Sequence, residues 1–172
     1  MAIVEKNYFD IEHIILLGGR MSKRAKKISK VLVALDGSKQ SMKALDYAIE
    51  IARRQTAGLS AVSVLQYIRG GMVPYVDTPV YDKKRISRDR AKIRVILNAA
   101  HKKAKIQQVH LNTFIIEGEE SISDAIIKYA KSKDFDMIVV GSKNKKGLKR
   151  LLLGSVSLDI VSNADCPVLV VK

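Results

Sequence analysis

Short apolar runs alternate along the chain with longer segments in which apolar residues recur every three or four positions. The clearest run covers residues 31–35, and further strands are expected at residues 59–65, 110–116, 137–140 and 168–171. Continuous apolar runs of this length are typical of strands that are buried on both faces of a sheet. The pattern therefore predicts five buried strands.

Between these strands the apolar spacing changes to that of amphipathic helices. One stripe, with spacings of one and four, consists of Ala44, Leu45, Ala48, Ile49 and Ala52. Further helices are expected over residues 83–105, around the stripe at residues 122–130, and around the stripe formed by Leu148, Leu152, Val156 and Ile160. Each predicted helix falls between two predicted strands.

This alternation predicts an α/β fold: a doubly wound, open, parallel five-stranded sheet with helices on both faces, which is a Rossmann-like arrangement. In such sheets, ligands bind beyond the carboxyl ends of the strands, where the strand order reverses. Three candidate binding segments directly follow the carboxyl ends of predicted strands, namely Asp36-Gly37-Ser38, residues 66–82 and residues 141–154. Because parallel strands share one edge, we expect these segments to converge.

The segment 137–155 carries the clearest binding chemistry. Its apolar strand ends in Gly141-Ser142, and a second pair, Gly154-Ser155, opens an apolar helix. A strand end, a tight loop and a helix N-terminus together can direct backbone N–H groups toward an anion. Taken alone, Gly141 is typical of a plain turn and Gly154 of helix packing, so their joint placement carries the hypothesis of a phosphate site.

The net charge of the chain is +14, from 31 Lys and Arg against 17 Asp and Glu. Such a charge favours anionic partners, among them nucleotides, nucleic acid and membrane surfaces. The excess is concentrated at residues 23–27, 83–105 and 143–150. A solvated helix face and general solubility explain the first two clusters, whereas the third, which includes Lys143, abuts glycines at a strand end.

Several classes of protein are disfavoured by composition. No apolar run approaches the roughly 20 residues that span a bilayer. The single Cys166 excludes an internal disulfide and fits a reducing compartment, so we expect a cytoplasmic protein with a buried, inert thiol. The three histidines lack metal ligands at suitable spacing. No Walker A motif follows Gly141, so we expect any hydrolysis of a bound phosphate ester to be slow at most.

Two segments are left open. Residues 1–27 form an extension before the domain at residues 28–172, and it is interpreted either as disordered or as a misassigned start, with translation beginning at Met21. Its apolar residues 14–17 are too few for a signal peptide, and we do not place them in the fold. The loop 66–82, with three tyrosines, is long enough to be either a lid over a ligand or a disordered segment without a role.

The pattern Gly141-x-x-Asn144-x9-Gly154-Ser155 resembles the nucleotide-binding signature of universal stress proteins, which is Gly, two residues, Gly, nine residues, Gly, then Ser or Thr. The resemblance covers about residues 28–172, including residues 31–38 and the terminal residues 163–171. It implies a doubly wound five-stranded parallel sheet and a homodimer joined through the C-terminal strand Val168–Val171.

The resemblance also implies a ligand, ATP, with or without Mg²⁺. By this similarity Asp36 contacts the nucleoside, Ala34 lies near the base and Val64 offers a backbone contact to adenine. Val140 and Gly141 match the surroundings of the ribose and α-phosphate. The residues expected around the phosphates are Ser142, Asn144, Gly154, Ser155 and Val156, with Lys143 as a neighbouring charge.

Asn144 departs from the signature because it replaces the middle glycine. Asparagine tolerates the left-handed backbone region, but its Cβ would obstruct a phosphate that approaches very closely. The predicted function is that of an adenine-nucleotide-binding stress-response sensor or regulator without dedicated catalysis. The alternatives are a nucleotide-free protein-interaction module on the same fold and a basic nucleic-acid-binding protein; the lack of a recognised reading helix weighs against the last.

Overall fold

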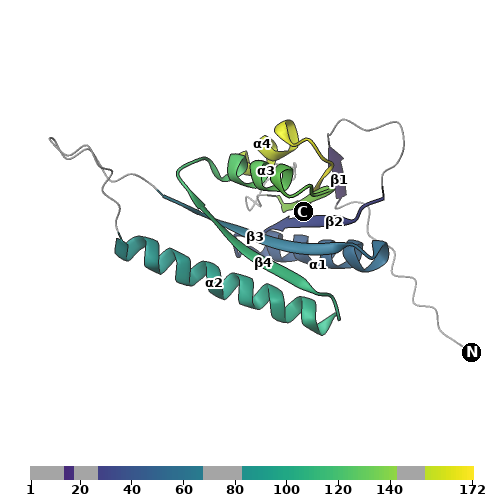
Figure 1. Cartoon of the computed structure of the whole chain (residues 1–172), viewed down its shortest axis with the longest axis horizontal. Coiled ribbons are helices and arrows are strands. Elements are labelled where there is room, and N and C mark those ends of the chain that lie inside the picture. The colour runs from purple at the N-terminus through teal and green to yellow at the C-terminus, as the bar shows by residue number, and fades with distance from the viewer. Residues whose placement is uncertain (1–13, 18–26, 68–82, 143–153) are drawn as a thin grey trace, which may run out of the picture.

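The structure is a computed structural model of the whole chain, and it describes residues 14–17, 27–67, 83–142 and 154–172 (Figure 1). Strands and helices alternate along the chain. The strands are β1 (Ile14–Leu17), β2 (Lys30–Ala34), β3 (Gly58–Gln66), β4 (Leu111–Gly118), β5 (Met137–Gly141) and β6 (Val168–Val171). The helices are α1 (Lys39–Gln55), α2 (Lys83–Ile106), α3 (Ile122–Ser132) and α4 (Ser155–Asn163).

The strands form one sheet in the order β1-β6-β5-β2-β3-β4. The five strands from β6 to β4 run parallel, with Val33 beside Ala61 on one side and beside Val139 on the other. The prediction of a doubly wound parallel sheet of five strands is confirmed for this part of the sheet. Strand ends differ from the predicted ones by one or two residues.

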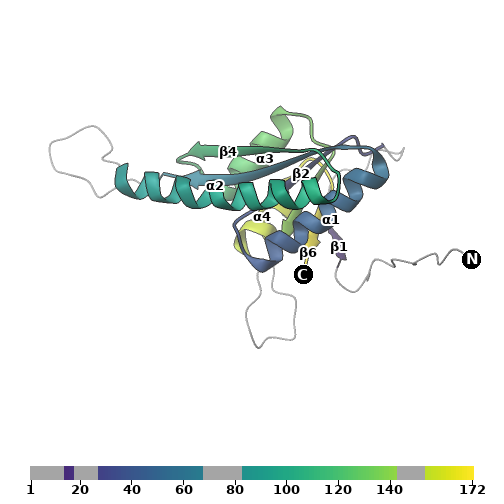
Figure 2. The same ribbon diagram turned by 90° about the horizontal axis from the view of Figure 1, so that it is seen from below.

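A sixth strand extends the sheet at the β6 edge. The expectation that residues 14–17 lie outside the fold is wrong, because β1 lies beside β6 (Figure 2). The two strands pair antiparallel, with Ile15 opposite Val170. The apolar run was too short to be assigned as a signal segment, and its partner lies more than 150 residues further along the chain. The extended pairing therefore could not be inferred from local pattern.

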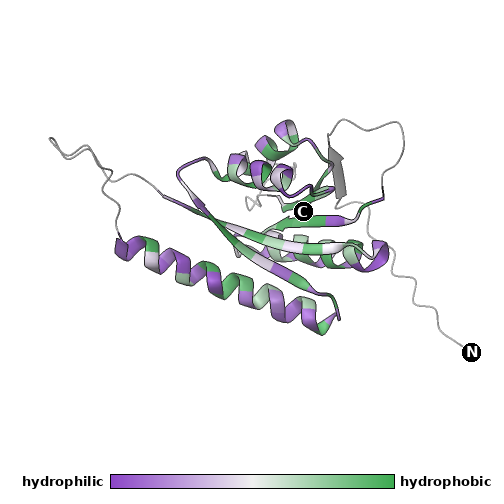
Figure 3. Cartoon of the chain, in the orientation of Figure 1, coloured by the Kyte–Doolittle hydropathy of each residue, from purple (hydrophilic) through white to green (hydrophobic). Residues whose placement is uncertain are grey.

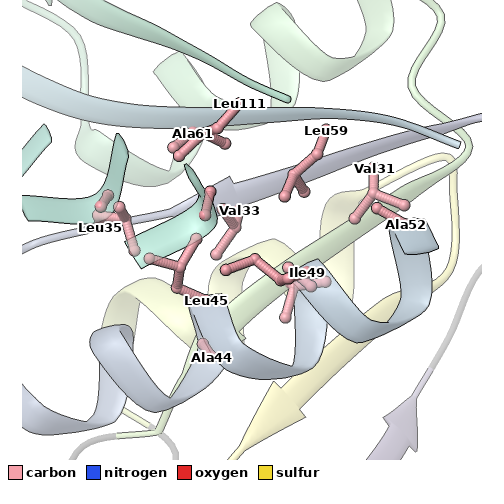
Figure 4. Packing of buried hydrophobic residues seen from close by; sticks show 14 of the residues in the cluster. Val31, Val33, Leu35, Ala44, Leu45, Ile49, Ala52, Leu59, Ala61 and Leu111 are labelled. Carbon is pink, nitrogen blue, oxygen red and sulfur yellow. The ribbon is translucent and has the colours of Figure 1, made fainter. Parts of the chain in front are cut away.

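Two helices cover each face of the sheet (Figure 1). On one face, α1 and α2 bury their apolar stripes against β2 and β3, and Leu45 and Ile49 lie among Val31, Val33 and Leu59 (Figure 4). On the opposite face, α3 and α4 pack on the alternate residues of the same strands. The alternation explains why the central strands read as continuous apolar runs, because both sets of side chains are buried.

Local signals set the helix starts. Ser38 accepts a hydrogen bond from the backbone N of Ser41 and caps α1, as predicted, and Ser121 caps α3 in the same way through Asp124. The last helix begins at Ser155, so that Val156 and Ile160 of the predicted stripe lie on it. Leu148 and Leu152, the other members of that stripe, lie outside the described residues.

The amino ends of the central strands are held by one carboxylate. Asp136, just before β5, accepts hydrogen bonds at Oδ2 from the backbone N of Ser29 at 2.9 Å, from Ser29 Oγ at 2.7 Å and from the backbone N of Lys30 at 3.0 Å. Its own backbone N donates to the Lys30 carbonyl at 2.9 Å. These bonds fix the relative positions of β2 and β5, whose other ends form the site described next.

Candidate functional site

A cavity of about 520 Å³ opens at the carboxyl ends of β2, β3 and β5. The chain leaves β2 for β3 on one side and later places β5 on the other side. The strand order therefore reverses between β2 and β5, which is where open α/β sheets bind ligands. The volume lies within the range of pockets that hold small molecules.

Most of the predicted site residues meet at this cavity. The nine that line it are Ala34, Asp36, Val64, Val140, Gly141, Ser142, Gly154, Ser155 and Val156. The remaining two, Lys143 and Asn144, lie outside the described residues. The convergence follows from parallel pairing, while the contribution of Asn144 stays a prediction.

Gly141 lets the end of β5 approach the start of α1. A Cβ at this position would lie 2.6 Å from the Gln40 carbonyl carbon and 2.7 Å from the Ser41 backbone N. Real Cβ atoms essentially never make such contacts with backbone, so a side chain would force the strand and the helix apart. The glycine thus sets the position of β5 relative to the first turn of α1 on the cavity wall.

Asp36 lies in a tight turn after β2. Its Oδ1 accepts a hydrogen bond of 2.9 Å from the backbone N of Ser38, and Gly37 between them has a positive φ of 81°. Partial burial raises the pKa of the Asp36 carboxyl, but hydrogen bonds from Ser38 and Ser41 together outweigh burial and hold that pKa below its usual value. Asp36 lines the cavity, where its ionised carboxylate is a hydrogen-bond acceptor.

The start of α4 forms the second polar part of the lining. Gly154 is the N-cap residue, with φ −64° and ψ 159°, and α4 has no side-chain cap hydrogen bond. The first backbone N–H groups of a helix have no partners within the helix and carry the positive end of its dipole. In α1, by contrast, Ser38 occupies the corresponding donor. The start of α4 is therefore suited to an anion.

An apolar wall completes the cavity on the side of β3. Its side chains come from β3, α2 and α3, and they are Val62, Val64, Ile93, Ile96, Ile122 and Ile126. Ile93 is 9% exposed and Ile122 is 37% exposed, so the wall runs from the core to the surface. The cavity thus combines an apolar wall that can hold a ring with a helix start that can hold an anion.

The apolar wall and the start of α1 were not among the predicted parts of the site. The isoleucines were assigned only to helix stripes, because apolar spacing does not distinguish a side chain facing the core from one facing a cavity beside it. Gln40 and Ser41 also line the cavity, next to Gly141. No local sequence pattern marks Ser41 as a cavity residue, because its position there depends on how α1 packs against the end of β5.

A hydrogen-bonded network lies beside the apolar wall, at the ends of β3 and β4. Arg90 donates to Glu117 through Nε at 2.9 Å and through Nη2 at 2.7 Å, and the Tyr67 hydroxyl donates to the same carboxylate. The backbone N of Tyr67 donates to the Gly118 carbonyl at 2.7 Å. Because Arg90 and Ile93 are one turn apart on α2, the network holds α2 against the two strands next to the cavity.

Cys166 lies apart from the cavity lining. Burial raises the pKa of the half-buried Cys166 thiol, which lies just before β6 and away from the lining. Within the described ranges, no three His, Cys, Asp or Glu residues are grouped as metal ligands. None of the described helices is long and apolar enough to cross a membrane.

The parallel sheet and the cavity at its switch point define a Rossmann-like α/β protein. The model of the universal stress protein family matches residues 27–172, and the chain belongs to that family. The chain is 36% identical over 151 residues to the universal stress protein YxiE of Bacillus subtilis, with 84% of this chain and 99% of that protein covered.

Two further similarities bear on the extension and on the fold. A universal stress protein of Methanocaldococcus jannaschii is 32% identical over 167 residues, covering 96% of this chain and 91% of that protein. A match of that extent necessarily includes Ile14–Leu17, which precede the family match. A universal stress protein solved in complex with cAMP is 25% identical, with a TM-score of 0.61 and coverage of 86% of this chain and 98% of that one.

Proposed function

We propose that the cavity binds an adenine nucleotide, with ATP as the expected ligand, and that the protein is a sensor or regulator in a stress response. The observation that carries the proposal is the division of one cavity into an apolar wall and an uncapped helix start. A nucleotide has the same division between its base and its phosphates. The structural relative in complex with cAMP supports an adenine nucleotide as the class of ligand.

The base and ribose belong at the β2–β3 side of the cavity. The base would lie against Val64 and the isoleucines of α2 and α3, since aromatic rings bind by burying apolar area. Asp36 is ionised and accepts hydrogen bonds, and we propose that it accepts one from a ribose hydroxyl. Ala34, at the end of β2, also lines the cavity.

The phosphates belong at the β5–α4 side. The backbone N–H groups at the start of α4 and the hydroxyl of Ser155 are donors that an anion needs. Lys143 and Asn144 follow the end of β5 in sequence and are proposed to contribute there as well. Magnesium that binds with ATP usually keeps several water ligands and takes the others from phosphates and one or two carboxylates. Asp36 is the one carboxylate among the described lining residues, so most ligands of such an ion would be phosphate and water oxygens.

The described lining favours binding over dedicated turnover. It contains one carboxylate and no histidine, so it offers no evident general base beside the proposed phosphate position. We propose that occupancy of the site changes the surface around it, and that this surface is read by a partner. The cytoplasmic location and the homodimer through Val168–Val171 belong to the same proposal.

Isothermal titration with adenosine, AMP and ATP, each with and without Mg²⁺, tests the ligand. Ile122→Glu places a negative charge on the cavity rim, and its matched control Val95→Glu makes the same change on the outer face of α2, where Val95 is 69% exposed. We expect Ile122→Glu to weaken ATP binding about tenfold or more and Val95→Glu to leave it nearly unchanged. Lack of binding by the unaltered chain at millimolar ATP would count against the proposal and support the nucleotide-free module.

The charge of α2 supports a second candidate, nucleic-acid binding. This helix carries ten Lys or Arg residues and one acidic residue, and Figure 3 shows hydrophilic residues along its length, interrupted by hydrophobic ones. Lys83, Lys84, Ser87 and Arg88 line a hollow at its start. If α2 binds RNA or DNA, the logarithm of the affinity should fall steeply and linearly with the logarithm of salt concentration. An affinity independent of salt would exclude this candidate.

A further inference from the structure

The outer edge of β6 has the features of an association surface. All four of its residues are at most 3% exposed, and the strand contains no charge and no proline. Val168 and Val170 pack in the cluster beneath α3 and α4, while Leu169 and Val171 pack on the opposite face. An apolar strand at the edge of a sheet is a template for pairing with another strand unless something covers it.

The direction of the β6 backbone groups shows which of them need a partner. The backbone N of Ile138 donates to the Pro167 carbonyl, and the backbone N of Ser142 donates to the Val171 carbonyl. Backbone groups alternate between the two sides of a strand, so Leu169 also faces β5. Val168 and Val170 therefore direct their N–H and C=O groups outward.

β1 meets these outward groups. In the antiparallel register, Leu17 lies opposite Val168 and Ile15 lies opposite Val170. Antiparallel partners alternate between pairs that exchange two hydrogen bonds and pairs that exchange none, and these two pairs are of the hydrogen-bonded kind. The backbone groups of Ile14 and Leu16 consequently point away from β6.

The other edge of the sheet is different. On β4, the side chains of Asn112, Thr113 and Glu117 are exposed, as is Phe114. Polar and charged side chains are common on edges that do not associate. The parallel part of the sheet thus has a polar edge at β4 and an apolar edge at β6. Among the described strands, the four-residue β1 is the one that pairs with the β6 edge from outside.

We propose that β1 is an intramolecular competitor of the homodimer proposed above, because it occupies the outer edge of β6 at which a second copy of this chain would pair. Antiparallel pairing of β6 with itself is compatible with a two-fold axis, which is the commonest symmetry of protein dimers. A tethered segment acts at an effective concentration of the order of millimolar, so β1 holds the edge at micromolar protein. The proposal refines the proposed homodimer and does not depend on nucleotide binding.

Two features of residues 1–20 bear on this competition. The similarity to the archaeal relative includes Ile14–Leu17, although the family match begins after them. A chain that starts at Met21 would lack β1 and keep every other element. Removal of residues 1–20 therefore removes the segment that pairs with the outer edge of β6.

Analytical ultracentrifugation of four chains tests the proposal: the full chain, residues 21–172, Ile15→Pro and Leu16→Pro. Proline at position 15 removes an N–H that faces β6, whereas proline at position 16 removes one that faces away, so Leu16→Pro is the matched control. We expect residues 21–172 and Ile15→Pro to dimerise at least about tenfold more tightly than the full chain and Leu16→Pro. Thermal unfolding confirms that each chain is folded.

Amide exchange measured by NMR supplies a second readout. At dilutions where residues 21–172 are monomeric, the amides of Val168 and Val170 should exchange faster than in the full chain, while those of Leu169 and Val171 should keep their protection. Folded residues 21–172 that stay monomeric over the full concentration range would overturn the proposal. Dimerisation that requires β1 would overturn it too, because it would indicate strand exchange between copies. ATP titration of the same chains separates either failure from failure of the nucleotide site.

Discussion

Gly141 lies so close to the start of α1 that a Cβ on it would be 2.7 Å from the backbone N of Ser41. This contact joins the strand end that leads toward the proposed phosphate position with the helix start on the same cavity wall. Backbone lies on both sides of the contact, so no side-chain rotation can relieve an added atom. Packing of β5 against α1 therefore requires glycine at position 141, whether or not this residue contacts a ligand.

Gly141→Ala is expected to destabilise the fold by about 1–3 kcal/mol, the range found for overpacked sites. It should also weaken ATP binding, because β5 and α1 would separate at the cavity. Gly118→Ala is the control, since a Cβ there would meet only the Glu120 side chain at 4.0 Å. Urea unfolding and ATP titration of both variants measure the two effects. Equal stability of the two variants would contradict the packing argument.

Gly154→Asp should change stability and binding in opposite directions. The φ of Gly154 is −64°, which other residues adopt readily, and aspartate is a favourable N-cap residue. We expect unfolding to become harder by a few tenths of a kcal/mol, because the new carboxylate accepts from the N–H groups at the start of α4. ATP affinity should fall about tenfold or more, since the same groups are then occupied and a negative charge has been added.

Adenosine provides the control for Gly154→Asp. It carries no phosphate, so its affinity should change far less than that of ATP. If both ligands lose the same affinity, the start of α4 is not the phosphate position.

The parallel sheet could be predicted because each central strand carries its own signal. Residues 31–35 and 137–140 are apolar on both faces, and helix spacing intervenes between them. The strand ends then determine most of the site, as Asp36 and Gly141 show. Features that depend on distant partners could not be read in this way. Asp136 binds Ser29 and Lys30 across more than 100 residues, and no local pattern marks that pairing.

The pH dependence of stability should reveal Asp36. Its pKa in the folded protein is below the usual value of about 3.9, so its stabilising contribution is complete above that value and is lost as the pH falls through the folded-state pKa. Asp36→Asn should therefore lower the unfolding free energy at pH 7, and the difference from the unaltered chain should shrink below about pH 4. Urea unfolding at a series of pH values measures this.

Asp36→Asn should also weaken adenosine binding, which Asp89→Asn should not. Asp89 is a suitable control because Lys92 lowers the pKa of its carboxyl too, but it lies on α2 outside the cavity lining. Equal adenosine affinities of the two variants would remove Asp36 from the proposed site.

Asp136→Asn should separate stability from binding. Asp136 accepts three hydrogen bonds at one charged oxygen, far from the cavity at the other end of β5. Hydrogen bonds to charged groups contribute about 1.5–3 kcal/mol, so a loss of about 2 kcal/mol is expected. The ATP affinity of the folded variant should be unchanged. A parallel loss of affinity would show that the amino ends of the strands determine the geometry of the cavity.

The pKa of Tyr67 should be higher than that of an ordinary tyrosine. Its hydroxyl donates to Glu117, and this hydrogen bond raises the pKa of Tyr67 because it stabilises the protonated phenol. The negative charge of the carboxylate raises that pKa further. Glu117→Gln removes the charge, so the pKa of Tyr67 should fall toward its usual value of about 10. NMR of ¹³Cζ-labelled tyrosine measures the change. The pKa of Tyr129, which is raised by burial alone, should stay where it is and serve as the internal control. If Tyr67 and Tyr129 shift together, Glu117→Gln has altered the fold and the network beside the cavity is not a local one.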